Sequence, residues 1–304
     1  GVGEADVRTV LQAVLDRHGM LRLRVEDDGA GGWSLSVPEP GSVPAADCVS
    51  TVAVVSEETL AVGRSRLDLA AGRMVHALWV PESRRLALIV HHLAVDAVSW
   101  RILLEDINIA WAQHHSGQSI TLPTGGTSFA RWANLLDGHA RSAAVTRLAD
   151  TWRQVTAVPA ALPAVQPDRD TYANAGRLSL SMDAELTRQL IGEVPTAFHA
   201  GVQDILLIAF GLAVKEFLGT GATPVAVDVE GHGRDEELAR DVDLSRTVGW
   251  FTAKYPVALS LGQIAWDQVR TGDAALGAVI KDAKEQLRAL PDGLTYGLLR
   301  YLNP

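Results

Sequence analysis

Apolar residues at helical spacing open the chain. They predict a helix over residues 4–18, and Gly19 follows where a left-handed residue commonly ends a helix. Alternating apolar and polar residues over 21–25 and 33–37 predict two strands joined by a glycine-rich turn. Residues 38–50 hold three prolines and no period, so they are expected to form a loop.

Two apolar runs follow, at 74–80 and 86–90, and both predict strands. The second run is continuous rather than alternating, which is typical of a strand covered on both faces. It leads into His91-His92-Leu93-Ala94-Val95-Asp96, and a long amphipathic helix is expected next. The apolar side of that helix is predicted to carry Trp100, Leu103, Leu104, Ile107 and Trp111.

A proline-rich stretch near the middle separates two repeats of a loose strand–helix pattern. The sequence predicts an amino-terminal half over 1–160, a linker over 161–176 and a carboxyl-terminal half over 177–304. Before the linker, a loop over 113–126 and helices over 128–136 and 139–155 are expected. After it, strands are expected at 177–182, 224–230 and 252–259, and helices at 184–194, 202–217 and 273–290. Strands that alternate with helices predict an α/β fold.

Composition excludes several classes of protein. With 304 residues, 47% hydrophobic and 21% charged, the chain can bury a substantial core and is not a disordered, collagen-like or coiled-coil chain. A net charge of −9 argues against nucleic-acid and anionic-membrane partners. Cys48, the single cysteine, can form no internal disulfide. No apolar run reaches the roughly 20 residues of a membrane helix, and no signal peptide opens the chain, so we expect a cytoplasmic protein.

The first candidate site is the segment from His91 to Asp96, at the end of a predicted strand. Neighbouring side chains on a strand point to opposite faces, so His91 and His92 are not expected to share a metal ion. One should face the core and the other a cleft, where a histidine suits proton transfer because its pKa lies near working pH. Asp96, at the turn into the helix, can hold backbone donors or an arginine. The alternative is a pair of packed core histidines with an N-capping aspartate.

The second candidate is Glu230-Gly231-His232-Gly233-Arg234, again at the end of a predicted strand. A partly desolvated glutamate there can carry a proton. The two glycines suggest an unusual backbone path or a close approach to the main chain. The alternative is a solvated charged loop, since six charged residues follow by Asp243.

The absence of several motifs narrows the range of possible enzyme chemistry. No Gly-x-Gly-x-x-Gly, Walker, His-Glu-x-x-His or Gly-x-Ser-x-Gly motif occurs, which argues against nucleotide binding, metalloprotease and serine-hydrolase chemistry. No metal site is expected, and a thiol nucleophile at Cys48 is only a remote option. Residues 243–252 are expected to form a shaped loop, and residues 296–302 a buried helix start.

Together these stretches resemble the epimerization domains of nonribosomal peptide synthetases, within the condensation-domain superfamily. Residues 91–97 match the superfamily signature His-His-x-x-x-Asp-Gly, with Ala97 in place of the glycine. Several stretches resemble the epimerization branch in particular: Val98–Leu103, Glu230–Arg234, Arg246–Thr252, Tyr296–Tyr301, and Thr127-Ser128-Phe129 with Trp132. The family's amino-terminal segment and a carboxyl-terminal motif are not found, so we expect most of one domain.

The resemblance implies a V-shaped pair of chloramphenicol-acetyltransferase-like halves with a central tunnel. The substrate would be an aminoacyl or peptidyl thioester on the phosphopantetheine arm of a carrier domain of the same synthetase, with no cofactor bound directly. Its α-carbon would be inverted by proton removal and redelivery, giving a D-residue for secondary metabolism. His92 matches the family's catalytic histidine and Glu230 its glutamate. The supporting residues would be His91, Asp96, Ser99, Trp100, Arg234 and Tyr296.

Two alternatives stay open. A condensation domain would also use His92, but it needs no glutamate in the setting of Glu230. A non-catalytic docking module would only bind a carrier protein. The substrate side chain and the carrier contacts are not predicted by any motif.

Overall fold

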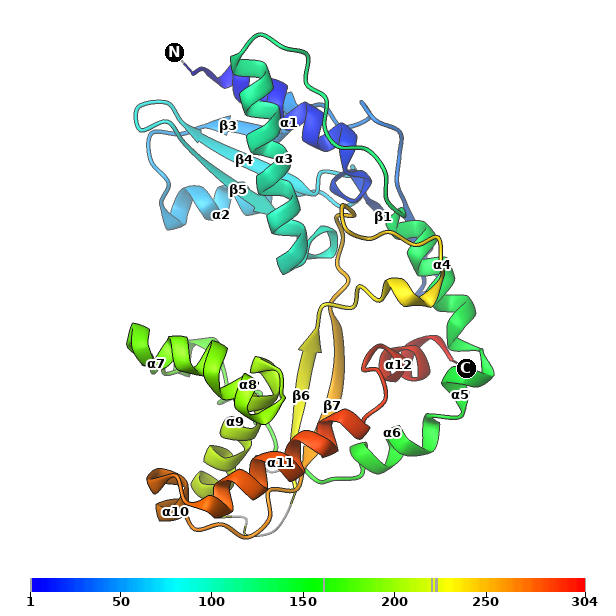
Figure 1. Ribbon diagram of the computed structural model, residues 1–304. Coiled ribbons are helices and arrows are strands. Elements are labelled where there is room, and N and C mark those ends of the chain that lie inside the picture. The colour runs from blue at the N-terminus through cyan, green and yellow to red at the C-terminus, as the bar shows by residue number, and fades with distance from the viewer. Residues whose placement is uncertain (1, 161, 220, 222–223, 304) are drawn as a thin grey trace. The chain divides into compact units, whose positions relative to one another are not determined.

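The computed structural model describes residues 2–160, 162–219, 221 and 224–303 (Figure 1). The chain divides into two compact units, Gly1–Leu136 with His232–Thr252 and Asp137–Gly231 with Ala253–Pro304. These bounds differ from the predicted division, because residues 232–252 belong to the first unit, where Val248 joins the hydrophobic core. The segment predicted as a linker falls inside the second unit, and its residue 161 lies outside the described residues.

The first unit is built on a three-stranded sheet in the order β3 (Val49–Thr51), β4 (Val75–Val80), β5 (Arg85–Val90). β3 pairs parallel with β4, and β4 pairs antiparallel with β5. Both predicted strands are confirmed, but the strand covered on both faces is β4, whose six residues are all buried. β5 is exposed at its start and half-buried later, because it is an edge strand that pairs only with β4 in this three-stranded sheet.

Three helices cover this sheet. α1 (Glu4–Arg17) and α3 (Ala97–His115) pack against each other and share a core with Val75, Ala77 and Trp79. The other face of β4 meets α2 (Glu57–Ser65), where Leu78 lies close to Gly63. The prediction of α1 is confirmed.

The buried face of α3 differs from its predicted apolar side. Leu104 is 53% exposed, so its placement on the buried side was wrong. The buried residues are Ser99, Ile102, Leu103, Asp106 and Ala110. Two of them are polar and partnered, so the buried stripe passes through positions that a hydrophobic pattern does not count.

The predicted hairpin is confirmed as β1 (Arg24–Asp27) paired antiparallel with β2 (Trp33–Ser36). Its first strand starts later than expected, because Gly19–Arg22 form a 3₁₀ turn. Arg22 is buried rather than facing solvent, and its guanidinium donates to carbonyl oxygens of Leu15 and Pro38. A charged donor bound to carbonyls at the end of α1 is stabilised there.

Three helices follow the predicted loop after α3: α4 (Phe129–Ala140), α5 (Ala143–Thr146) and α6 (Ala149–Thr156). The helix predicted over 139–155 is therefore broken into two short ones. Ser142 caps the first of them, because its side chain accepts a hydrogen bond from the backbone N–H of Val145, and the break between the two lies at Arg147 and Leu148.

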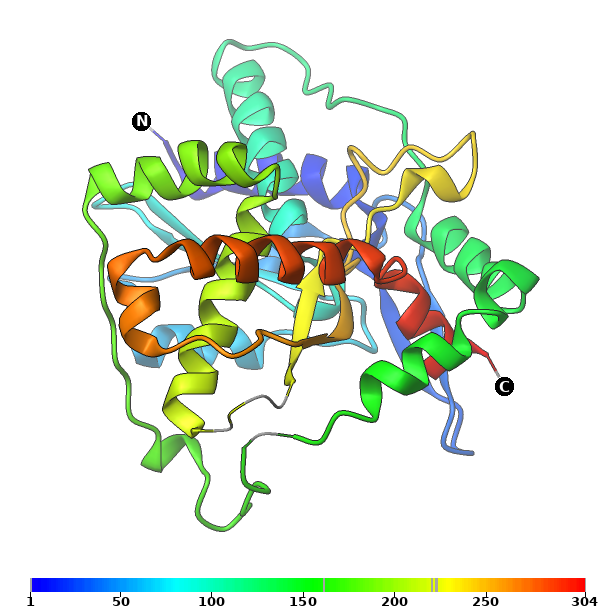
Figure 2. The same ribbon diagram turned by 60° about the horizontal axis from the view of Figure 1, so that its bottom comes forward.

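The second unit holds the antiparallel pair β6 (Val225–Gly231) and β7 (Ala253–Leu259). α9 (Val202–Leu218) and α11 (Ala274–Ala289) pack against this pair, and α11 crosses it in Figure 2. All four elements were predicted. Their shared core contains Ile208, Leu212, Val225, Val229, Val257, Leu259, Leu261 and Ala283.

The strand predicted at 177–182 is wrong. These residues join no strand, and Leu178 and Leu180 are 87% and 90% exposed. Alternation becomes a strand only where a neighbouring strand supplies hydrogen bonds, and none pairs with them in the described part of the chain. The helix expected next is present as α7 (Ala184–Arg188), a π-helical turn and α8 (Val194–Phe198).

The remaining helices are α10 (Trp266–Thr271) and α12 (Leu294–Gly297), which a π-helical turn continues over Leu298–Leu302. The helical structure expected at 296–302 is thus confirmed, but the helix starts at Leu294, and the expectation that this stretch is buried was wrong for Tyr301, which is 70% exposed. Within the described residues no single helix is long and apolar enough to cross a membrane. Only Ala184–Phe198 and Val202–Leu218 together, bent by 97°, have the required length and composition.

Candidate functional site

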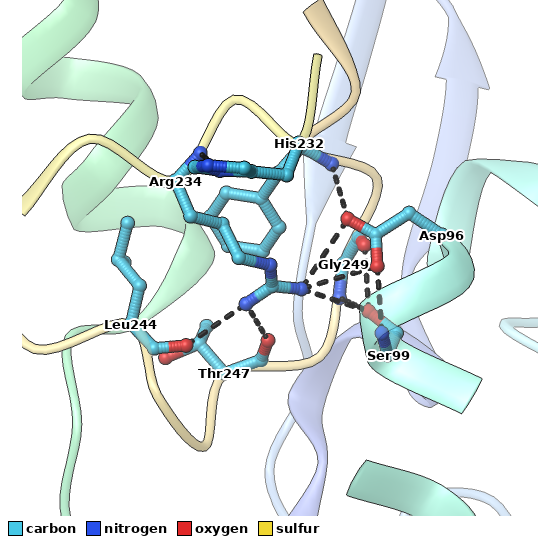
Figure 3. A network of polar contacts seen from close by, with 8 residues as sticks. Asp96, Ser99, His232, Arg234, Leu244, Thr247 and Gly249 are labelled. Carbon is cyan, nitrogen blue, oxygen red and sulfur yellow. Dashed lines mark hydrogen bonds and ion pairs between the residues drawn. The ribbon is translucent and has the colours of Figure 1, made fainter. Parts of the chain in front are cut away.

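Asp96 is the centre of a buried polar network in the first unit (Figure 3). It is the N-cap of α3, and its Oδ1 accepts the N–H of Ser99 at 2.7 Å. Its Oδ2 accepts the N–H of Phe251 at 3.2 Å, and the Nη2 of Arg234 lies 3.2 and 3.3 Å from the two oxygens. The expectation that Asp96 holds backbone donors or an arginine is confirmed, because it holds both.

Arg234 ties the loop 244–251 to the start of α3. Its Nη1 donates to the carbonyl oxygens of Leu244 at 2.8 Å and Thr247 at 2.7 Å, while its Nη2 donates to Ser99 Oγ at 3.1 Å. The guanidinium lies 3.9 Å from the centre of the Phe251 ring. Burial lowers the pKa of Arg234 and Asp96 opposes that shift, but a guanidinium stays charged at any working pH.

Ser99 and Gly249 lock the same loop to the helix. The fully buried hydroxyl of Ser99 donates to the carbonyl oxygen of Gly249 at 2.8 Å and accepts its N–H at 3.0 Å. A Cβ at Gly249 would lie 2.4 Å from the ring of Phe129. Only glycine allows this approach, so the contact between the loop and α3 depends on a residue without a side chain.

The two histidines occupy different environments just after β5. His91 is half-buried, and its Nδ1 accepts the N–H of Leu93 at 3.2 Å. His92 is exposed and begins a short 3₁₀ turn, with its ring centre 4.7 Å from that of Trp250. Ala97, which replaces the signature glycine, is the first residue of α3, a conformation that any L-residue adopts.

The backbone around His232 is unusual in one place. Gly233 has a φ of +64°, and the N–H of Arg234 returns to Nδ1 of His232 at 3.0 Å. The unusual path expected from the two glycines is therefore present at Gly233, whereas Gly231 continues β6. This turn directs the Arg234 side chain into the network.

The other predicted site residues lie outside this network. Trp100 is half-buried and packs against the first unit's core. Glu230 belongs to the second unit, exposed on β6 in register with Lys254. Tyr296, also of the second unit, packs against Trp152 with ring centres 5.4 Å apart, and its hydroxyl accepts from Arg300 at 3.2 Å.

A second buried network, which sequence reasoning missed, joins His18, Asp106 and Arg246. His18 Nε2 lies 2.7 Å from Asp106 Oδ2, and both side chains are almost fully buried. Arg246 pairs with Asp106 and also with Glu105. The available signal was the spacing of Asp106, seven residues after Ser99 and on the same helix face.

Acidification is expected to destabilise the fold through two buried histidines. Burial lowers the pKa of His18, against the pull of Asp106, and burial with Arg66 and Arg73 lowers that of His76. The unfolded chain, with histidine pKa near 6.5, therefore binds more protons at mildly acidic pH. The free energy of unfolding should be highest above about pH 7 and fall steadily toward about pH 5.

Urea denaturation at several pH values measures how the free energy of unfolding changes with pH. His76→Gln should remove part of this change, because one of the two groups no longer titrates. A free energy of unfolding that does not change between these pH values would contradict the assignment.

Other reactive groups are less suited to chemistry. Burial raises the pKa of the Cys48 thiol to about 11, so it is protonated at neutral pH and a weak nucleophile. In the part of the chain that the structure describes, no three His, Cys, Asp or Glu side chains gather where they could hold a metal ion.

Comparison with known proteins adds to this geometry. Residues 2–302 match the family model described as the condensation domain. The chain is 31% identical over 314 residues to bacitracin synthase 3 of Bacillus licheniformis, a match that covers 99% of this chain and 5% of that protein. It is 41% identical over 245 residues to surfactin synthase subunit 1 of Bacillus subtilis (strain 168), which covers 79% of this chain and 6% of that protein. The chain thus spans a small part of these synthases.

Solved structures are similar as well. The epimerization domain from the third module of tyrocidine synthetase B has 30% identity and a TM-score of 0.83, over 100% of this chain and 69% of that one. The first condensation domain of the calcium-dependent antibiotic synthetase has 17% identity and a TM-score of 0.66, over 95% and 66%. This second likeness concerns the mixed α/β fold alone.

Proposed function

Because the chain belongs to the condensation-domain family, we propose that it epimerizes the α-carbon of an aminoacyl or peptidyl thioester. The thioester is carried on the phosphopantetheine arm of a carrier domain of the same nonribosomal peptide synthetase. The proposal includes the two acetyltransferase-like halves and the tunnel that the sequence resemblance implies. Because the carrier domain brings the substrate on its phosphopantetheine arm, the carrier domain is the proposed binding partner of this protein.

One observation carries the choice of epimerization over condensation. The chain is 30% identical over its full length to an epimerization domain, against 17% to a condensation domain. The Glu230–Arg234 segment supports the same choice, because Glu230 offers a carboxylate that condensation does not require. A condensation domain that joins two carrier-bound substrates is the second candidate.

The chemistry needs two groups that exchange protons with one carbon. In the proposed mechanism one of His92 and Glu230 removes the α-proton, and the electron pair moves onto the thioester carbonyl as an enolate. The other group then delivers a proton to the opposite face, so each group ends in the other protonation state and resets through solvent. Both side chains are exposed within their own units and free to meet a substrate.

The Asp96 network is assigned the role of positioning His92. Asp96 binds the N–H of Phe251 and Ser99 binds both polar backbone groups of Gly249, so the residues on either side of Trp250 are fixed. Trp250 packs beside the His92 ring and limits its orientations. Asp96, Ser99 and Arg234 thus act through Trp250 rather than by contact with substrate.

A single loaded carrier domain tests the proposal. The protein is incubated in deuterium oxide with an L-aminoacyl or L-peptidyl carrier and no acceptor, and the released residue is analysed for configuration and deuterium. Epimerization predicts a mixture of D and L residues that carry α-deuterium. A condensation domain would leave the residue unchanged until an acceptor carrier is added, and a docking module would leave it unchanged in both cases.

A further inference from the structure

A cavity of about 310 Å³ lies within the first unit, at the end of α1. Three segments distant in sequence enclose it: residues 17–20, 125–130 and 246–248, with Val37 at one side. Its polar lining consists of Arg17, His18, Thr127, Ser128, Arg246 and Thr247. Met20, Phe129 and Val248 provide an apolar wall. A volume of this size suits a small molecule.

One of the two arginines in the lining, Arg17, has no carboxylate partner among the described residues. Arg17 donates to the carbonyl oxygen of Pro123 at 2.5 Å and of Gly125 at 3.1 Å, and within the described residues it forms no ion pair. Arg246 is turned toward Asp106 and Glu105, which lie outside the lining, and its Nε is buried without a hydrogen-bond partner among the described residues.

The buried imidazole of His18 adds no second positive charge to the lining. Its Nε2 is bonded to Asp106, and burial keeps the ring neutral near pH 7, with Arg17 and Arg246 adding to that effect. Because Arg246 is paired with Asp106 and Glu105, Arg17 is the cation of the lining that has no carboxylate partner among the described residues. A negatively charged group in the cavity would be attracted to the Arg17 guanidinium.

The wall of the cavity is already fixed. Thr127 N–H donates to the carbonyl oxygen of Asp243 at 2.6 Å, and Thr247 Oγ1 donates to the carbonyl oxygen of Thr127 at 2.7 Å. Gly126 has a φ of +91°, and a Cβ there would lie 3.2 Å from Thr247 Oγ1. A ligand would thus meet a preorganised site and lose less free energy to loop ordering.

From this arrangement we propose that the cavity binds a small oxyanion, a phosphate or a carboxylate, attached to a short apolar group. The charge of the Arg17 guanidinium suits an oxyanion, and the apolar wall suits the attached group. The site is separate from the proposed epimerization chemistry and does not depend on it.

Titration calorimetry of the whole chain with inorganic phosphate, acetate, phenyl phosphate and benzoate tests the proposal. Ionic strength is held constant with chloride. Saturable binding of one equivalent is expected, with phenyl phosphate or benzoate tighter than the anion without its ring. The phosphate and carboxylate pairs show which oxyanion is preferred. No saturable binding of any of the four would overturn the proposal.

Two variants locate the binding. Ala130, exposed in the first turn of α4, lines the cavity, so Ala130→Asp adds a repelling carboxylate at a position where helices tolerate one. It should weaken binding about tenfold, whereas Ala130→Asn, which has the same size without the charge, should change it little. Arg17→Gln should weaken binding about as much, and Arg8→Gln on the same helix should not. Equal loss in Arg17→Gln and Arg8→Gln would show a general charge effect and overturn the assignment.

Discussion

Asp96→Ala is expected to lower the free energy of unfolding by about 3–5 kcal/mol, because it leaves the buried Arg234 guanidinium without its carboxylate. The Arg234 side chain is only 8% exposed, so water cannot replace the lost partner. The same change removes the N-cap of α3 and the acceptor for the Phe251 N–H. Urea denaturation of the wild type and the variant measures the difference.

Two further variants separate charge from capping. Asp96→Asn keeps an oxygen that can cap α3 but loses the negative charge, so it should cost less than Asp96→Ala. The double variant Asp96→Leu with Arg234→Met removes both charges and should recover much of the stability lost in Asp96→Leu. If Arg234→Met brings no recovery, the ion pair is not what makes Asp96 important.

Element positions were predictable wherever the local pattern and the buried surface agree. α1, α9 and α11 show this, since their apolar residues lie at helical spacing and pack on their own unit's strands. Residues 177–182 show the opposite case. Their alternation is as clear as that of a strand, but strand formation depends on a partner elsewhere in the chain, which no local pattern reports.

The sequence predicted several residues of the site, but it did not predict which of them form hydrogen bonds and ion pairs with one another. The signature segment indicated Asp96, and the Glu230–Arg234 segment indicated Arg234, but no spacing says that two residues so far apart in sequence share an ion pair. The loop that contains Gly249 and Trp250 was predicted only as a shaped loop. Its role depends on the fit of Gly249 beside Phe129 and on the buried Ser99 hydroxyl.

The buried pair of His18 and Asp106 shows a second reason why part of the polar network could not be predicted from the sequence. In sequence, His18 stands at the end of an amphipathic helix and Asp106 within another, where a hydrophobicity pattern expects solvent. Each polar side chain is buried because the other, or Arg246, satisfies it. A pattern that scores residues one at a time cannot find such mutual burial.

The catalytic proposal makes the largest kinetic prediction. His92→Ala and Glu230→Gln should each slow interconversion of L and D residues on a carrier thioester by about 10²–10⁴-fold, the usual contribution of a positioned acid or base. The double variant should be little slower than either single variant, because a proton must both leave and return. Matched controls are His115→Ala and Asp228→Asn, which change an exposed histidine in α3 and an exposed carboxylate in β6.

Isotope exchange then assigns the two roles. A variant that lacks one group cannot invert the carbon, but its remaining group can still remove and return the α-proton on its own face. Deuterium should therefore enter the L-substrate without inversion in one variant and the D-substrate in the other, which identifies the base for each enantiomer. Undiminished inversion in His92→Ala or in Glu230→Gln would remove that residue from the mechanism. A variant that loses inversion but keeps the urea midpoint of the wild type is still folded. Its loss of inversion would then show that the replaced group transfers a proton.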